Sequence, residues 1–527
     1  MNRRFNTAGP CRPDWHYMLP PEARLPQARR LIDEGQYFVL HAPRQSGKTT
    51  LFHSLAGELN QEARYAVVYA SCETAQAAGD DADAAVAAVL RALEAQAADL
   101  PDGHRPPPVD DFRSIEAEER LRQWLAAWCR RAKRPVVLFL DEVDALLGAG
   151  LITVLRQLRA GFVDRPGRFP QAVALIGLRD VRDYKADLRP EDETLGTSSP
   201  FNIKSDSLAL RNFTASEVQE LYRQHENQTG QKFDERAVER AYELAGGQPW
   251  LINALARHVV EELCVDGSEI EARHVEAAKE ILIRRRDTHL DSLVARLREA
   301  RVRRVLEPIL TGEPPTEQIY DDDVSFAIDL GLVARTDLGL QIANPIYREI
   351  IPRALTATTE DFVRIDRSRF IASDGSLLWS DLLDGFLEFW LANAEWLLRR
   401  EKSYPEAAAQ LLLMAFLHRV VNGATAGKSA SIDREFAVGS GRIDLLVRWP
   451  HEPEVQCFAV EIKVWRDRAA DPVASGLEQL GRYLDRLGLD TGTLVIFDQR
   501  SAAAALPKRC GRTELEHDGR RIDLLRL

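Results

Sequence analysis

The 527-residue sequence contains no apolar run that approaches the roughly 20 residues a helix needs to cross a bilayer. No secretory signal peptide opens it, and its six cysteines are scattered without paired spacing. These absences argue against a membrane protein, a disulfide framework and a cysteine-rich zinc site. We therefore expect a protein of the reducing cytoplasm with no membrane partner.

The sequence also lacks a repeat of solenoid length and any long low-complexity tract. Hydrophobic residues make up 45% of the chain and charged residues 28%, which is typical of a soluble globular protein with several domains. The net charge of −12 argues against broad coating of nucleic acid. Any contact with DNA must therefore be local.

Strands and helices alternate along residues 1–212. The apolar runs YFVLHAP, YAVVYASC, PVVLFLDE and AVALIGL are typical of buried strands, and helical patterns separate them. This alternation predicts a parallel sheet with helices on both faces. Residues 213–287 have helical patterns throughout, beginning at FTASEVQELYRQ, where Thr214 and Glu217 have capping-box spacing.

The remaining sequence predicts three further parts. Helical patterns followed by the hairpin-like LVARTDLGLQIANP predict a winged helix. A helical linker follows, and the C-terminal part alternates helices with strands such as RIDLLVRW and CFAVEIKVW. We expect a multidomain α/β protein divided at residues 1–212, 213–287, 288–358, 359–402 and 403–527.

HAPRQSGKTTL has the spacing of a phosphate-binding loop between a strand and a helix, except that Ala42 replaces the first glycine. Backbone N–H groups would cradle the phosphates, Lys48 would reach the β- and γ-phosphates, and Thr49 would hold Mg²⁺. Alanine removes no backbone donor, so the cradle stays feasible. The predicted nucleotide-binding residues of the loop are Ala42, Pro43, Arg44, Gln45, Ser46, Gly47, Lys48, Thr49 and Thr50.

A phosphate-loop pattern also arises by chance, but PVVLFLDEVDAL weakens that explanation. It brings Asp141 and Glu142 to the carboxyl end of a buried strand, where an open α/β sheet binds its ligands. Asp141 would position Mg²⁺ through its water shell, and Glu142 would polarise the attacking water. Together the two motifs predict ATP binding and hydrolysis.

APRQSGKTT, FLDEVD, GLRD and GGQPWLINALA resemble the prokaryotic AAA-like ATPases of the archaeal and STAND or origin-recognition branch, over roughly residues 1–355. The resemblance implies an ATPase core, a helical lid that carries the GGQP turn, and a winged helix. It also implies nucleotide sensing or charge stabilisation by Arg179, for which a surface charge at a strand end is an equal alternative. ATPases of this fold often complete their site with a neighbour's arginine, which is compatible with a homo-oligomer.

FAVEIKVW sets an acid and a lysine two residues apart in a strand, so Glu461 and Lys463 share one face. Alone, this pattern is typical of a solvated strand. GRIDLLVRW adds Asp444 about one hairpin upstream, and two carboxylates from neighbouring strands suit Mg²⁺ or Mn²⁺. Lys463 could orient the attacking water or stabilise charge on a phosphate.

The following helix adds Gln479 and Tyr483, one turn apart on one face. The order G-x-x-D, E-x-K, Q-x-x-x-Y resembles the PD-(D/E)XK nuclease superfamily near its RecB-like branch, over roughly residues 400–527, although Ile443 replaces the literal proline. This resemblance implies a restriction-endonuclease-like domain with catalytic Asp444, Glu461, Lys463, Gln479 and Tyr483. It also implies metal binding by Glu406, with Glu435 nearby, and either glutamate could equally be a solvated charge.

These patterns predict an ATPase that controls Mg²⁺- or Mn²⁺-dependent cleavage of DNA, in genome defence or control of mobile DNA by analogy with the architecture. The alternative is a STAND-like ATP-gated switch whose winged helix binds DNA or a partner while the nuclease-like domain only recognises. Eight arginines between residues 284 and 304 could contact DNA phosphates, although their interspersed acids favour an ordinary solvated helix face.

Overall fold

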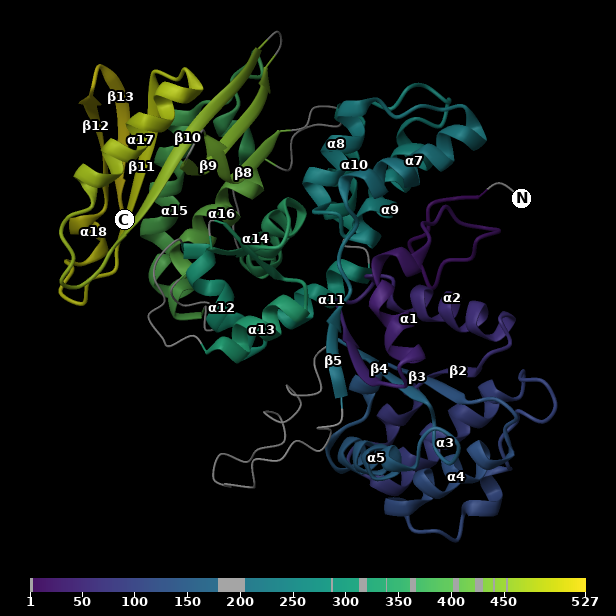
Figure 1. Cartoon of the computed structure of the whole chain (residues 1–527). Coiled ribbons are helices and arrows are strands. Elements are labelled where there is room, and N and C mark those ends of the chain that lie inside the picture. Colours follow the sequence, from purple (N-terminus) through teal and green to yellow (C-terminus); the bar gives the residue numbers. More distant parts are fainter. Residues whose placement is uncertain are drawn as a thin grey trace. The chain divides into compact units, whose positions relative to one another are not determined.

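The computed structural model describes residues 3–178, 204–285, 288–311, 320–337, 339–360, 366–400, 407–421, 430–438, 441–451 and 454–527. The chain forms two compact units (Figure 1). The first comprises Met1–His289 and Tyr320–Asn344, and the second comprises Leu290–Ile319 and Pro345–Leu527. The chain therefore passes from one unit to the other within the region that the sequence assigns to a winged helix.

A five-stranded sheet in the order β2-β3-β4-β1-β5 forms the centre of the first unit. Neighbouring strands are parallel throughout, which confirms the predicted parallel sheet. The sequence does not predict β5, because KSDSLA lacks an apolar run and pairs at the sheet edge through its backbone. The strands are β1 (Tyr37–His41), β2 (Ala66–Ser71), β3 (Val136–Asp141), β4 (Ala172–Gly177) and β5 (Lys204–Ala209).

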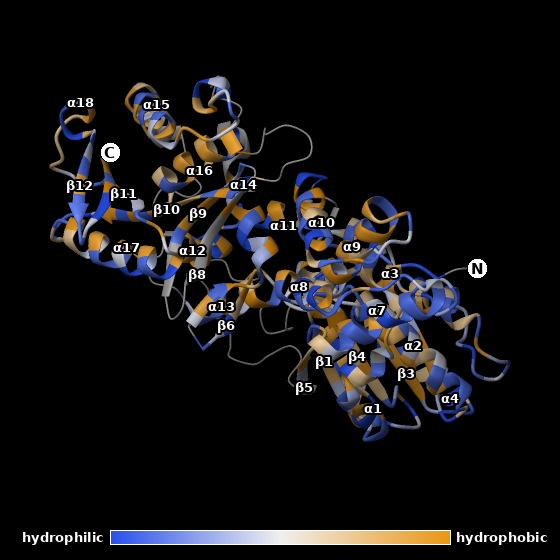
Figure 2. Ribbon diagram, turned by 90° about the horizontal axis from the view of Figure 1, so that it is seen from above, coloured by the Kyte–Doolittle hydropathy of each residue, from blue (hydrophilic) through white to orange (hydrophobic). Residues whose placement is uncertain are grey.

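Helices cover both faces of this sheet (Figure 1). α1 (Pro26–Asp33) and α2 (Lys48–Gln61) pack on one face. α3 (Ala82–Ala97), α4 (Ala117–Arg131) and α5 (Gly148–Gly161) pack on the other. Because both faces are buried, the central strands are mostly hydrophobic (Figure 2).

After β5, the chain of the first unit continues in the helices α7 (Ala215–Thr229), α8 (Glu235–Ala245), α9 (Pro249–His258) and α10 (Ala272–Arg285). The predicted capping box is present at the start of α7, where Thr214 and Glu217 each accept the other's backbone N–H. Between α8 and α9, Gly247 has a φ of 70°, and a Cβ there would lie 2.1 Å from the Phe213 carbonyl oxygen. This turn therefore requires glycine.

The elements expected in a winged helix are present, but they are divided between the units. α13 (Asp321–Asp329) and the antiparallel strands β6 (Val333–Thr336) and β7 (Gly339–Ile342) belong to the first unit. α12 (Ala300–Thr311) and α14 (Pro345–Glu360) belong to the second, and α11 (Thr288–Arg296) spans the division. A single winged-helix domain over residues 288–358 therefore stays a prediction.

A six-stranded sheet in the order β12-β13-β11-β10-β9-β8 forms the centre of the second unit. α17 (Val473–Leu487) packs on one face, and α15 (Trp379–Arg400) and α16 (Ala408–Val421) pack on the other. No described helix is both long and apolar enough to span a membrane. The strands are β8 (Ser431–Val438), β9 (Gly441–His451), β10 (Glu454–Trp465), β11 (Thr491–Asp498), β12 (Gly511–His517) and β13 (Arg520–Arg526).

Substitution of two helical glycines in the first unit is expected to change its stability in opposite directions. A Cβ on Gly57, in α2, meets nothing within 4 Å, whereas a Cβ on Gly161, in α5, would lie 2.3 Å from the buried Phe169 ring. We expect Gly57→Ala to stabilise the first unit, because alanine favours a helix over glycine by about 1 kcal/mol. Gly161→Ala should destabilise it, because overpacking costs roughly 1–3 kcal/mol.

Calorimetric unfolding of both variants beside the wild type measures these shifts. The two unfolding temperatures should move to opposite sides of the wild-type value. Equal shifts would contradict the described packing of α5 on Phe169.

Candidate functional site

The phosphate-binding loop, residues 42–47, connects β1 to α2 at the carboxyl edge of the parallel sheet. Its backbone is left-handed at Gln45, with a φ of 57°, and at Gly47, with a φ of 92°, but not at Ala42. Ala42 is buried in a conformation that any residue can adopt. The alanine in place of the expected glycine therefore introduces no backbone strain.

Lys48 is the first residue of α2, and its ammonium group turns back over the loop. Its Nζ donates to the carbonyl oxygens of Ala42 at 2.6 Å and Pro43 at 2.9 Å. Burial lowers the pKa of Lys48 to about 8, while the charge of Asp141 acts in the opposite direction. A phosphate would be a stronger partner than these neutral carbonyls and would favour the charged lysine.

Asp141 ends β3 directly beside the start of α2. Thr49 Oγ1 donates to Asp141 Oδ2 at 3.0 Å, so the two residues expected to hold Mg²⁺ are in contact. The Asp141 carboxylate is 2% exposed and also accepts hydrogen bonds from the Tyr69 hydroxyl and the Glu142 N–H. Hydroxyl and carboxylate oxygens are the ligands Mg²⁺ prefers, so this pair fits the ion.

Glu142 has a left-handed φ of 54°, which is uncommon for a residue with a side chain. This conformation leaves Glu142 exposed while its neighbour Asp141 is buried. Ser71 Oγ donates to Glu142 Oε2 at 3.0 Å, and partial desolvation by the surrounding protein raises the pKa of the Glu142 carboxyl. The backbone thus separates one buried carboxylate from one that can meet a water molecule.

The structure adds residues that the motifs do not predict. Tyr69 and Ser71 lie on β2, and Ser71 pairs in register with Asp141. A polar residue at the end of a predicted strand was the available signal for Ser71. Asp144 accepts the Leu178 N–H at 2.6 Å and so connects the segment after β3 to the end of β4.

The other residues predicted to bind nucleotide differ in their exposure and hydrogen bonds. Arg44 and Gln45 are exposed, and Thr50 Oγ1 accepts the Cys11 N–H at 3.0 Å. Arg179 lies outside the described residues, so its predicted role stays a prediction.

α13 packs against the phosphate-binding loop within the first unit. His41, the last residue of β1, has its Nδ1 2.9 Å from Asp329 Oδ1 on α13. A Cβ on Gly331, just after α13, would lie 2.7 Å from Pro43 Cγ. The loop is therefore in direct contact with the segment that carries β6 and β7.

The second candidate site lies on β9 and β10 of the second unit. Leu445 pairs with Val460 in the antiparallel register, which brings Asp444 beside Glu461. The Ile462 N–H donates to Asp444 Oδ2 at 2.7 Å. Glu461 is 0% exposed, and burial, with the charge of Asp444 second, raises the pKa of its carboxyl to about 8.

Lys463 links Glu461 to α17. Its Nζ donates to Glu461 Oε1 at 2.8 Å and to Gln479 Oε1 at 2.9 Å. Gln479 Nε2 in turn donates to the Tyr483 hydroxyl at 3.3 Å. The structure thus joins the strand residues and the helix residues of the predicted nuclease motif in one network.

Glu461 Oε2 is buried and has no hydrogen-bond partner among the described residues. A buried carboxylate oxygen without a partner is costly, and a cation would compensate it. The described residues contain no group of three or more His, Cys, Asp or Glu side chains that could hold a metal ion, so Asp444 and Glu461 would supply two ligands. Two carboxylates fit Mg²⁺, which usually keeps several waters. Glu406 and the Glu435 side chain lie outside the described residues.

Residues 31–184 match a family described as an AAA domain. No curated protein matches this chain. Among solved structures, the Walker-type ATPase PABY2304 of Pyrococcus abyssi is similar, with 14% identity and a TM-score of 0.47 over 66% of this chain and 99% of that one. The RuvB Holliday junction branch migration motor of Thermotoga maritima has 18% identity and a TM-score of 0.33 over 62% and 92%. Cdc6p from Pyrobaculum aerophilum has 14% identity and a TM-score of 0.36 over 67% and 98%.

The family match includes the phosphate-binding loop and the β3 carboxylates. The chain therefore contains an AAA-type P-loop ATPase domain, which confirms that part of the predicted fold. The match ends before α7, so the functional assignment of the second unit depends on its own side chains.

The pKa of Lys48 leads to a pH-dependent affinity for ATP. Phosphate binding requires the charged lysine, and the protonated fraction falls as the pH rises above about 8. We expect the dissociation constant for ATP to be constant near pH 7 and to rise by up to about tenfold per pH unit beyond pH 8.

Calorimetric titration with ATP across this pH range measures the effect. Lys48→Met should bind more weakly and without this dependence. A wild-type dissociation constant that does not change with pH would contradict the role given to Lys48.

Proposed function

We propose that this protein is an ATP-driven, metal-dependent nuclease, in which the first unit hydrolyses ATP and the second cleaves DNA phosphodiesters. The AAA domain supports the ATPase half. The observation that carries the nuclease half is the contact of Lys463 with Glu461, whose second carboxylate oxygen is buried and has no partner in the described part of the chain.

In the ATPase half, the N–H groups at the start of α2 and the Lys48 ammonium bind the phosphates. Thr49 and Asp141, which are in contact, would hold Mg²⁺, and Glu142 would orient the attacking water. α7–α10 act as a helical lid. Trp250 Nε1 on α9 donates to the Thr7 carbonyl at 2.8 Å, which supports a lid that closes against the N-terminal segment.

In the nuclease half, Asp444 and Glu461 would hold Mg²⁺ or Mn²⁺, and the ion would supply an activated water and neutralise charge on the phosphate. The Lys463 ammonium stabilises negative charge that develops on the phosphate oxygens. Gln479 accepts a hydrogen bond from Lys463 and so holds the ammonium in position. Tyr483 in turn positions the Gln479 amide.

The contact of α13 with the phosphate-binding loop supports control of cleavage by ATP. The His41–Asp329 pair and the Pro43–Gly331 contact would respond to a change in the loop on nucleotide binding. The same segment continues through β7 directly into α14 of the second unit. The backbone thus connects the segment that contacts the phosphate-binding loop to the unit that carries the nuclease-like residues.

The same contact also favours a second candidate function. In this alternative, the protein is a STAND-like, ATP-gated switch in which α11–α14 form a winged helix that binds DNA or a partner. The nuclease-like unit would then recognise DNA without cutting it. Assembly into a homo-oligomer is compatible with both functions.

Substitutions in the second unit test the nuclease. We expect Asp444→Asn, Glu461→Gln and Lys463→Met to lower cleavage of supercoiled and linear DNA by at least about 100-fold, because each removes an interaction with the metal or the phosphate. ATP hydrolysis should stay within about twofold of the wild type, because the residues lie outside the ATPase domain.

The matched control is Glu478→Gln, because Glu478 neighbours Gln479 but is exposed and pairs with Arg482 on the surface of α17. This variant should cleave like the wild type. Cleavage by Asp444→Asn at the wild-type rate would overturn the site. A wild type that hydrolyses ATP but never cuts DNA in Mg²⁺ or Mn²⁺ would support the switch instead.

A further inference from the structure

Arg24 has a buried charge at a position that no motif identifies. It ends a short 3-10 helix two residues before α1, and it is 6% exposed. Burial lowers the pKa of Arg24 to about 10, so it is still charged at neutral pH. Among the described residues it forms no ion pair with a carboxylate. A buried charge is costly unless it is compensated, so the groups that contact the Arg24 guanidinium indicate why it is buried here.

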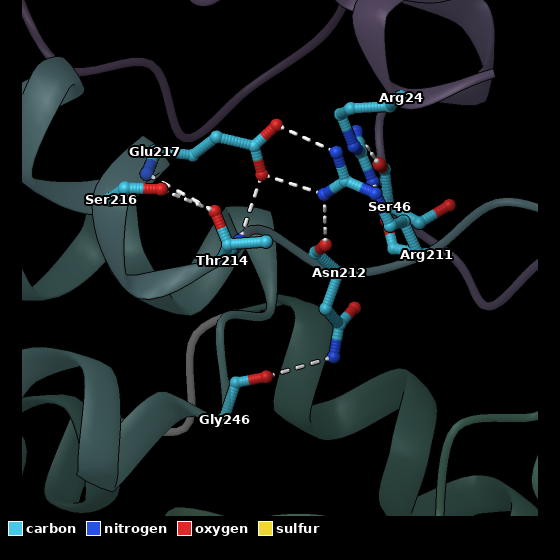
Figure 3. Close-up of polar contacts among 8 residues, drawn as sticks. All are labelled: Arg24, Ser46, Arg211, Asn212, Thr214, Ser216, Glu217 and Gly246. Carbon is cyan, nitrogen blue, oxygen red and sulfur yellow. Dashed lines mark hydrogen bonds and ion pairs between the residues drawn. The ribbon is translucent and has the colours of Figure 1, made fainter. Parts of the chain in front are cut away.

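The guanidinium of Arg24 contacts two carbonyl groups and one aromatic ring. Nη1 donates to the Ser46 carbonyl at 2.8 Å, and Nη2 donates to the Arg211 carbonyl. Cζ lies 4.9 Å from the centroid of the Phe213 ring. Figure 3 shows Arg24 between the phosphate-binding loop and the chain that leads into α7.

The contact with Ser46 bears on the direction of the Gly47 N–H, one of the groups that the proposed function assigns to phosphate binding. The Ser46 carbonyl and the Gly47 N–H belong to one planar trans peptide, in which the two groups point in opposite directions. By holding the carbonyl, Arg24 turns the Gly47 N–H away from itself. The Arg24 guanidinium packs closely against the Gly47 backbone, because a Cβ on Gly47 would lie 3.1 Å from Arg24 Nη1.

The second contact reaches a segment that is fixed to the helices after the sheet. Arg211 forms two hydrogen bonds with the Glu217 carboxylate, at 2.6 and 2.8 Å. Asn212 Nδ2 donates to the Gly246 carbonyl at 3.0 Å, and the Phe213 N–H donates to the Gly247 carbonyl at 2.8 Å. Residues 211–213 are therefore bonded both to α7 and to the turn before α9 (Figure 3).

We propose that Arg24 is a positioning residue for ATP turnover, which fixes the Ser46–Gly47 peptide of the phosphate-binding loop to the first residues of the α7–α10 segment. A rotation of that segment away from the sheet would break the contact with Arg211 or Phe213 and release the Ser46 carbonyl. The geometry of the phosphate cradle and the position of the helices thus change together. This proposal deepens the ATPase function and depends on it.

The test compares Arg24→Met, which keeps the aliphatic stem, with Arg24→Lys, which keeps the charge but not the fork of donors. We expect Arg24→Met to lower kcat/KM for ATP by at least about tenfold, with most of the loss in kcat. The reason is that the substitution misorients the phosphate-binding loop for catalysis more than it weakens the binding of ATP. Arg24→Lys should fall between Arg24→Met and the wild type. Guanidinium ion at low millimolar concentration should restore part of the activity of Arg24→Ala.

The matched control is Arg29→Met, because Arg29 lies nearby on α1 but pairs with Glu62 at the surface. Its kinetics should equal those of the wild type. If Arg24→Met does not fold, Phe213→Leu removes the ring contact alone and should lower kcat in the same direction. Wild-type kcat and KM in Arg24→Met, or the absence of guanidinium rescue, would overturn the proposal.

A nucleotide-free readout separates this proposal from the ATPase function itself. Hydrogen exchange should be faster in Arg24→Met than in the wild type for the peptides that contain Gly47 and Phe213. If the wild type hydrolyses no ATP, the proposed function fails, whereas faster exchange still supports the connection made by Arg24. Unchanged exchange in both peptides would overturn that connection whatever the ATPase rate.

Discussion

A carboxylate that leaves water must be compensated, and both candidate sites depend on this constraint. In the first unit, buried Asp141 is compensated within the protein by Thr49, Tyr69 and the Glu142 N–H. In the second unit, Glu461 has one oxygen on Lys463 and one oxygen without a partner among the described residues. The oxygens of Asp141 are thus paired within the protein, while one oxygen of Glu461 has no partner among the described residues. This difference is the physical reason for proposing a metal at Glu461.

Much of the ATPase domain is predictable because its signals are local. The loop spacing, the strand ending in Asp141 and the Thr214–Glu217 capping box each lie within a dozen residues, and the structure contains all three. β5 could not be predicted, because four of its six residues are polar and it joins the sheet by backbone pairing with β1. The strands β12 and β13 were also missed. Neither strand has a long apolar run, and no residue of β12 is buried.

The features of the two sites that depend on contacts between residues far apart in the sequence could not be predicted. The pair Glu461 and Lys463 is visible in the sequence because strand geometry gives residues two apart a common face. Complete burial of Glu461 is not visible, because it results from the packing of α17 on the sheet. Arg24 gave no signal, since 187 residues separate it from Arg211. The predicted roles of Arg179 and Glu406 concern residues outside the described part of the chain.

Control of phosphodiester cleavage by ATP, as proposed for this chain, can be measured as the rate of DNA cleavage in Mg²⁺. The wild type is compared with ATP, with no nucleotide, and with a non-hydrolysable ATP analogue, beside Lys48→Met with ATP. We expect cleavage by the wild type to change with nucleotide and Lys48→Met to behave as the nucleotide-free protein. Equal cleavage under all four conditions would contradict control by the ATPase, even if both activities were present.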